Sequence, residues 1–168
     1  VRGSSAGGAV SVTSFAVEVD TVDFINVYAS NGGALYVNDK NDSNNEVIYS
    51  ILTVRNSHFS NCNSTLQTGN RIGGGAIHFY GSKLNVYDCT FTDCNGGDQA
   101  GAVFHRVDGD YNSWTTIAGC TFTNCSAKAA GGMELDSKNI EVSDCTFEHC
   151  VATERNGGGF NAYMTNSA

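Results

Sequence analysis

The sequence predicts an all-β protein folded as a right-handed parallel β-helix, and three observations lead to this prediction. A short motif centred on phenylalanine recurs five times, a glycine-rich apolar segment follows each copy, and proline is absent from all 168 residues. Short repeats without a helical period are typical of solenoids, in which each repeat forms one coil. Proline is excluded from such a stack because most strand residues have hydrogen-bonded neighbours on both sides.

The central motif of each repeat contains a phenylalanine, and in three copies two cysteines flank it. The clearest copies stand at 88–94, 119–125 and 144–150, with weaker ones at 56–62 and 21–27. Alternation along a strand places Cys and Phe of the CTF sequence on one face and Thr on the other. The repeat therefore predicts a core ladder with one rung per coil, formed by Phe24, Phe59, Phe91, Phe122 and Phe147.

Two further strands are expected in each coil. Alternating apolar residues upstream of the motif predict half-buried strands at 52–54, 84–86 and 140–142. The glycine-rich segments predict a third strand after a tight corner, at 7–12, 32–37, 74–79, 100–104, 131–135 and 157–160. Polar stretches at 38–46, 64–71 and 108–113 are expected to be loops.

These elements give about five coils, right-handed because parallel crossovers have that hand. We expect one β-helix segment over residues 1–168, belonging to a longer solenoid.

Charged residues make up 15% of the chain, and the net charge is −8. This acidic balance disfavours nucleic acid and anionic membranes as partners. No apolar run approaches the length of a membrane span in this segment.

The cysteines suggest disulfides. Six of the seven form C-x4-C pairs and are disulfide candidates: Cys89 with Cys94, Cys120 with Cys125, and Cys145 with Cys150. An alternative is a ladder of reduced or cross-coil cysteines, because stacked Cα atoms about 4.8 Å apart lie within disulfide range. Cys62 is expected to be unpaired within its own motif, since Ser57 occupies its partner's position.

Regular cysteine pairing favours an oxidising compartment, so the chain is expected to be secreted or displayed at a cell surface. Three N-x-S/T sequences are compatible with secretion and make Asn41, Asn63 and Asn124 glycosylation candidates.

No catalytic, cofactor-binding or metal-binding residue is predicted. The acidic residues near the phenylalanine strands lack basic partners, and Asp88 and Asp144 are expected to cap the bends before the cysteines. His78, His105 and Arg106 lie on or beside glycine-rich strands and could line a groove with Trp114. An ordinary exposed strand face is the alternative.

The pairing of F-x-x-N/D/C with a following GGAI resembles the polymorphic outer membrane protein repeat and Cys-rich extracellular β-helix proteins of protists and algae. The similarity covers about residues 7–163, with cysteine where the bacterial repeats usually have Asn or Ala. It implies a right-handed parallel β-helix at a cell surface or in secreted material, used for adhesion or assembly. The resemblance carries no catalytic residues.

The expected function is therefore that of an extracellular structural or adhesive solenoid, a building block of a surface filament or layer, without enzymatic activity. Its expected partners are further copies of itself, other surface or filament proteins, or glycans. The alternative is a carbohydrate-binding or carbohydrate-cleaving β-helix protein. A groove lined by Trp114, Tyr80, Tyr87 or Tyr111 beside carboxylates would favour that alternative.

Overall fold

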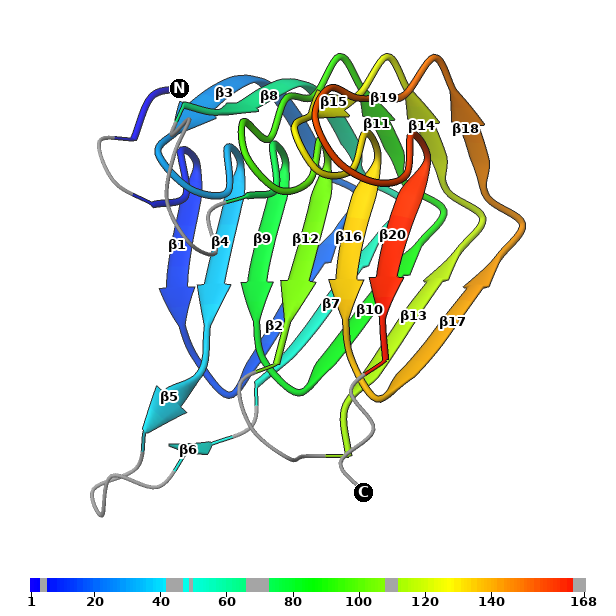
Figure 1. Ribbon diagram of the computed structural model, residues 1–168. Helices are drawn as coiled ribbons and strands as arrows, with labels where there is room; N and C mark the ends of the chain where they lie inside the picture. Colours follow the sequence, from blue (N-terminus) through cyan, green and yellow to red (C-terminus); the bar gives the residue numbers. More distant parts are fainter. Residues whose placement is uncertain (4–5, 42–46, 49, 66–72, 108–111, 165–168) are drawn as a thin grey trace.

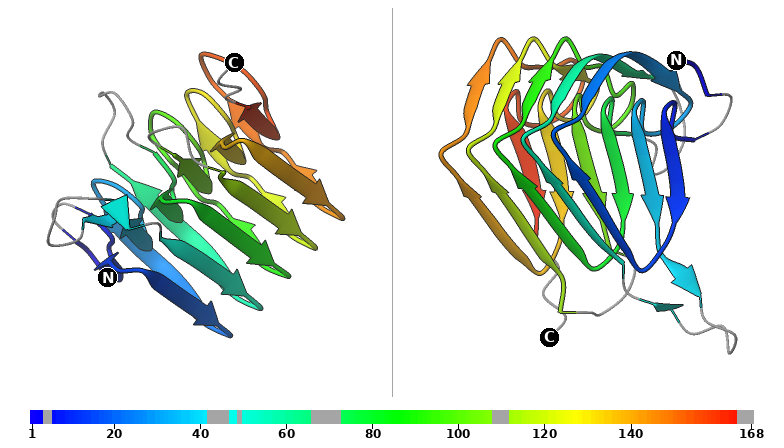
Figure 2. Two further views of the ribbon diagram at one scale, coloured as in Figure 1. Left: turned by 90° about the horizontal axis from the view of Figure 1, so that it is seen from below. Right: turned by 180° about the vertical axis from the view of Figure 1, so that it is seen from behind.

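The chain winds into five coils of three strands each, followed by the first strand of a sixth coil (Figure 1). The computed structural model describes residues 1–3, 6–41, 47–48, 50–65, 73–107 and 112–164. The coils advance along one axis, which Figure 2 shows from below and from behind. The all-β, parallel solenoid that the sequence predicts is confirmed.

Each coil contributes one strand to each of three parallel sheets. The first sheet contains β1 (Val10–Thr13), β4 (Leu35–Asn38), β9 (Ile77–Tyr80), β12 (Val103–Arg106), β16 (Met133–Asp136) and β20 (Phe160–Tyr163). The second contains β2 (Ala16–Asp20), β7 (Ile51–Arg55), β10 (Lys83–Tyr87), β13 (Trp114–Ala118) and β17 (Asn139–Ser143). The third contains β3 (Asp23–Ala29), β8 (His58–Ser64), β11 (Thr90–Thr92), β14 (Thr121–Thr123) and β18 (Thr146–Glu148).

Two small pairs lie outside these sheets. β15 (Ser126–Ala127) pairs in parallel with β19 (Val151–Ala152) in the loops between the third and first sheets. β5 (Lys40–Asn41) pairs antiparallel with β6 (Val47–Ile48). The segment 38–46, expected as a loop, thus contains β5, the first strand of a short hairpin. The β5–β6 pair projects from the stack in Figure 1.

The core of the solenoid is built from in-register columns. The five repeated phenylalanines stack ring on ring, with centroids 4.8–4.9 Å apart and planes within 11° of parallel. Leu52, Leu84 and Ile117 are fully buried on the inner face of the second sheet. Because each inward side chain contacts its equivalents in adjacent coils, packing requires similar residues at equivalent positions of every repeat.

Two sets of equivalent positions with positive φ explain the polar residues at the corners of the third sheet. Before this sheet, φ is between 50° and 66° at Thr21, Asn56, Asp88, Gly119 and Asp144. After each phenylalanine, φ is between 51° and 55° at Asn26, Asn61, Asp93, Asn124 and His149. Asn, Asp and Gly tolerate this left-handed conformation best. Backbone conformation therefore accounts for the acidic residue types at 88 and 144.

The glycine-rich segments allow coils to approach closely. A Cβ atom on Gly101 would lie only 1.8 Å from the carbonyl oxygen of Gly131 in the next coil. Any side chain there would push the coils apart, which explains the recurrence of glycine at this corner.

Candidate functional site

The outward face of the first sheet is partly covered by protein. His78, Phe104 and Glu134 all point away from the solenoid core, yet their exposed fractions are 0%, 2% and 8%. The loops that carry β15 and β19 curl in front of the upper ends of the strands in Figure 1. The carbonyl oxygen of Gly73, in the equivalent loop of an earlier coil, lies 2.7 Å from Nδ1 of His78. These loops create a recess where a solenoid face is normally exposed.

A cleft of about 280 Å³ opens on this face near β16, and we call it the β16 cleft. Two outward columns meet there, because Phe104 is in register with Glu134, and Arg106 with Asp136. β20 continues the second column with Tyr163. The cleft is lined by Phe104, Arg106, Glu134, Asp136 and Tyr163.

Ion pairs surround the β16 cleft. Arg106 Nε lies 4.0 Å from Asp136 Oδ2 within the cleft. In the covering loops, Arg155 Nη2 donates a hydrogen bond of 2.7 Å to Oδ1 of Asp98, linking loops two coils apart. Each arginine thus has an aspartate beside it.

Glu134 is the remaining carboxyl group of the β16 cleft, and it forms no ion pair with the described residues. Its Oε2 is buried and has no hydrogen-bond partner among the described residues. Burial raises the pKa of Glu134 to about 7, although Arg155 and Arg106 act in the opposite direction. A carboxyl group with this pKa exchanges its proton near neutral pH.

Unpartnered polar atoms gather in the column that contains Glu134. His78 Nε2 and Asn161 Nδ2 are also buried without a hydrogen-bond partner. Asn161 is in register with Glu134 in the neighbouring strand, and His78 lies two strands away, beyond Phe104. Buried polar groups without partners are rare in proteins, so their concentration in one column marks this surface as unusual.

The histidines differ from their sequence-based interpretation. His105 points into the core, where Nδ1 lies 2.7 Å from Thr115 Oγ1 and Nε2 lies 2.9 Å from the Gly81 carbonyl. Burial lowers the pKa of both His105 and His78 to about 4. The expectation of an exposed strand face is therefore wrong for both, since the core or the loops enclose them. Arg106 alone of this group reaches the β16 cleft.

The aromatic residues expected along a groove are not brought together. Tyr80 lies in β9 of the first sheet. Trp114 begins β13 and Tyr87 ends the adjacent β10, so these two stand at opposite ends of the second sheet. Tyr111 lies outside the described residues.

The cysteines form two ladders, one at each end of the third-sheet strands. The first contains Cys89, Cys120 and Cys145, and the second contains Cys62, Cys94, Cys125 and Cys150. In the second ladder each thiol donates to the carbonyl oxygen of the phenylalanine one coil earlier, at 3.4–3.6 Å. Hydrogen bonds with Cys125 and Cys62, with burial, raise the pKa of Cys94 well above its usual value.

All seven cysteines are free in the structure. The two members of each C-x4-C unit stand at opposite ends of a strand, and their thiol neighbours lie in adjacent coils. This geometry favours the cross-coil alternative over pairing within a coil. Both remain predictions, which peptide mapping of unreduced protein would distinguish.

The glycosylation candidates differ in accessibility. Asn124 is exposed, and its Nδ2 donates a 3.1 Å hydrogen bond to Asp93 Oδ1. Asn63 is half-buried and donates to Asn61 Oδ1 at 2.8 Å. The side chain of Asn41 lies outside the described part of the chain.

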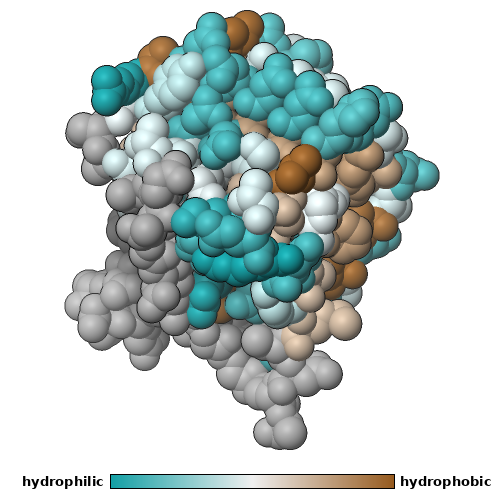
Figure 3. Space-filling view, turned by 45° about the horizontal axis from the view of Figure 1, so that its top comes forward, coloured by the Kyte–Doolittle hydropathy of each residue, from teal (hydrophilic) through white to brown (hydrophobic). Residues whose placement is uncertain are grey.

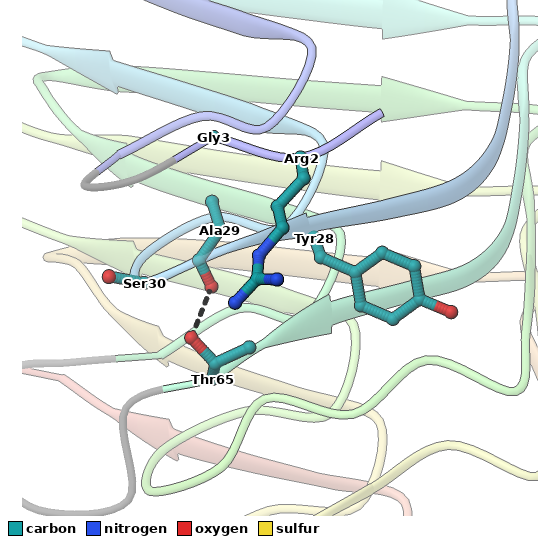
Figure 4. A pocket seen from close by; sticks show the side chains of 6 residues that line it. All are labelled: Arg2, Gly3, Tyr28, Ala29, Ser30 and Thr65. Atoms are coloured by element: carbon teal, nitrogen blue, oxygen red, sulfur yellow. Dashed lines mark hydrogen bonds between the residues drawn. The ribbon is translucent and has the colours of Figure 1, made fainter.

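A second hollow of about 410 Å³ lies near the first coil (Figure 4). Its lining combines one cation with small neutral groups: Arg2, Gly3, Tyr28, Ala29, Ser30 and Thr65. Thr65 Oγ1 donates to the carbonyl oxygen of Ala29 at 3.2 Å. The described lining residues include no carboxylate, so they offer less chemistry than the β16 cleft.

Sequence reasoning did not identify Glu134 and Asp136 as site residues. Their signal is two acidic residues at alternate positions of a strand that follows a Gly-Gly pair. Other coils carry Tyr, His and Phe in place of Glu134, and Tyr and Arg in place of Asp136. Within the described residues, no group of three or more His, Cys, Asp and Glu is arranged to hold a metal ion. The same residues contain no helix long and apolar enough to cross a membrane.

Comparison with known proteins identifies one family. The family described as a right handed beta helix region matches residues 2–168, almost the full chain. No curated protein and no solved structure gave a significant match.

Proposed function

This chain belongs to the right-handed β-helix family, and from that premise we propose that it is an extracellular structural or adhesive solenoid that stacks end to end with further copies. One observation carries the proposal, namely the in-register ladders and the open strand edges at both ends. β1 and β2 at one end, and β20, β17 and β18 at the other, each have a neighbour on one side only among the described strands. The outer edge of β3 is partly covered, because Arg2 forms a parallel bridge with Tyr28. Open parallel edges are templates for further strands.

Apolar side chains at both ends support stacking. Inward-facing apolar side chains are only partly buried at each end, among them Val17 and Val19 in the first coil and Ile140 and Val142 in the last. Phe160 of β20, in register with the buried Met133, is 43% exposed. In Figure 3, hydrophobic residues gather along the right-hand edge, the side where Figure 1 places the last coil.

Sedimentation and electron microscopy over a range of protein concentrations test this proposal. We expect end-to-end assembly, which Phe160→Lys should abolish by placing a charge on the end face, where this inward-facing side chain is 43% exposed. Thr116→Lys is the matched control, since Thr116 lies on the outer face of a central strand. A protein that stays monomeric at high concentration, or two variants that assemble alike, would contradict end-to-end stacking.

The extracellular part of the proposal rests on the cysteine repeats, the N-x-S/T sequences and the resemblance to surface β-helix repeats. Mass spectrometry of protein from its native source tests this directly. We expect glycan on the exposed Asn124. Fully reduced, unmodified protein recovered from the cytosol would refute an extracellular location.

A second candidate function is carbohydrate binding or cleavage at the β16 cleft. The observation that favours it is the carboxyl pair Glu134 and Asp136 on one face of β16, in which Glu134 has a pKa of about 7. A protonated carboxyl group beside an ionised one is the arrangement that acid–base cleavage of glycosides uses. A glycan array with a reducing-end release assay would test this, and Glu134→Gln should abolish release.

A further inference from the structure

The β16 cleft has a charge imbalance that points to a class of ligand. Arg106 stands beside Asp136, and Arg155 is bonded to Asp98. Among the described residues, Glu134 is then the carboxyl group of the cleft that makes no ion pair, although Arg155 and Arg106 act on it electrostatically. Its Oε2 is buried without a hydrogen bond. Burying an ionised carboxylate in this way is costly, and a ligand that supplies both a positive charge and an N–H donor removes the cost.

We propose that the β16 cleft binds a small ligand carrying a primary ammonium group, held by a charge-assisted hydrogen bond to Glu134. The ammonium group fits because it supplies one positive charge and up to three donors. Phe104 and Tyr163 line the same cleft and offer aromatic faces, which attract cations. The cleft volume of about 280 Å³ suits a small amine or the end of a lysine side chain.

This inference stands apart from end-to-end stacking and from carbohydrate cleavage, since it needs neither an open end nor a glycosidic bond. The acidic chain, with a net charge of −8, also concentrates cations near its surface. Binding sets the ammonium ion in competition with a proton at Glu134, so affinity should rise as pH increases. Within the part of the chain that the structure describes, the charged and titratable groups around Glu134 are Asp98, Arg106, Asp136, Arg155, Tyr163 and His78.

The test is a titration of the ¹⁵N-labelled chain with n-butylammonium chloride, followed by amide chemical shifts. We expect saturable shifts at Glu134, Phe104 and Tyr163, with a millimolar dissociation constant that suits so small a ligand. Sodium chloride at equal ionic strength controls for salt, and n-butanol supplies the same alkyl chain with a neutral hydroxyl. Equal shifts with n-butanol, or no saturable shifts with the amine, would overturn the proposal.

Glu134→Gln should weaken butylammonium binding roughly tenfold or more, the loss expected for a charge-assisted hydrogen bond. Glu141→Gln is the matched control, since it removes the same charge from an exposed position of β17 in the second sheet. Unchanged affinity in Glu134→Gln would reject Glu134 as the anchor. If that variant fails to fold, a pH titration of the native chain, followed by the ¹³C shift of the Glu134 carboxyl group, tests the proposal instead. Saturating amine should lower the pH midpoint of this titration, and an unchanged midpoint would reject the proposal.

Discussion

The first and third sheets run along the same solenoid, but they use their outward positions in opposite ways. The third sheet repeats small polar residues there, such as Thr90 and Thr121, because this face meets solvent. The outward column of the first sheet changes at every coil, from Tyr36 to His78, Phe104, Glu134 and Asn161. Both sheets repeat their inward residues. Packing therefore fixes the inner face of a solenoid, while the outer face can vary where loops enclose it.

Breaking the inner ladder should have the largest effect. Phe91→Ala removes a ring stacked between Phe59 and Phe122 in the central coils, and should lower the free energy of unfolding by about 3–5 kcal/mol. Urea unfolding measures this. Thr92→Ala, which changes the outward neighbour in the same strand, should cost less than about 1 kcal/mol. Equal losses in the two variants would refute the ladder as the main source of stability.

The buried histidines should make the protein sensitive to acid. The pKa of His105 is about 4 in the folded chain, below the usual 6.5, so the unfolded chain binds a proton more readily. The free energy of unfolding should therefore fall as pH drops from 6.5 to 4, by roughly 3 kcal/mol for this group. His105→Gln should flatten that part of the pH profile. The same acid dependence in variant and native chain would contradict this assignment.

Glu134 should change the free energy of unfolding with pH in the opposite direction to His105. Its pKa of about 7 exceeds the usual 4.5, so the folded chain holds this proton more tightly, and the free energy of unfolding should fall as pH rises from 4.5 to 7. Glu134→Gln should then stabilise the chain by about 2 kcal/mol near pH 8 and have little effect near pH 4.5. Thermal unfolding at the two pH values measures the difference. Destabilisation near pH 8 would show that the carboxylate has a partner in the fold.

The corner residues should give the smallest effect. Thr21 has a φ of 56° in a column otherwise formed by Asn, Asp and Gly. Thr21→Asn should raise the free energy of unfolding by about 1 kcal/mol, because a β-branched residue is strained there. Asn56→Thr, at the equivalent corner of the next coil, should lower it by a similar amount. Changes of the same sign in both variants would rule out backbone strain as the cause.

The sequence alone determined the solenoid, its five coils and the positions of most strands of the three sheets, but it did not predict β2, β13 or the short pairs β5–β6 and β15–β19. It could do so because inward packing and left-handed corners impose the same residue types on every coil, as at Phe91 and Asp88, and repetition makes those constraints visible. Family membership then confirmed the right-handed β-helix.

Only the tertiary structure revealed the β16 cleft. Glu134 and Asp136 occupy outward positions that alternation marks as exposed, and only the loops folded over the first sheet bury Glu134 and raise its pKa. His105 was equally hidden, because it replaces an apolar residue in the column that contains Phe79. Its Nε2 donates a hydrogen bond to the Gly81 carbonyl, and its Nδ1 is hydrogen-bonded to the Thr115 hydroxyl. Periodicity reports which face of a strand a residue occupies. What covers that face depends on contacts between distant parts of the chain, such as Arg155 with Asp98, which no local pattern encodes.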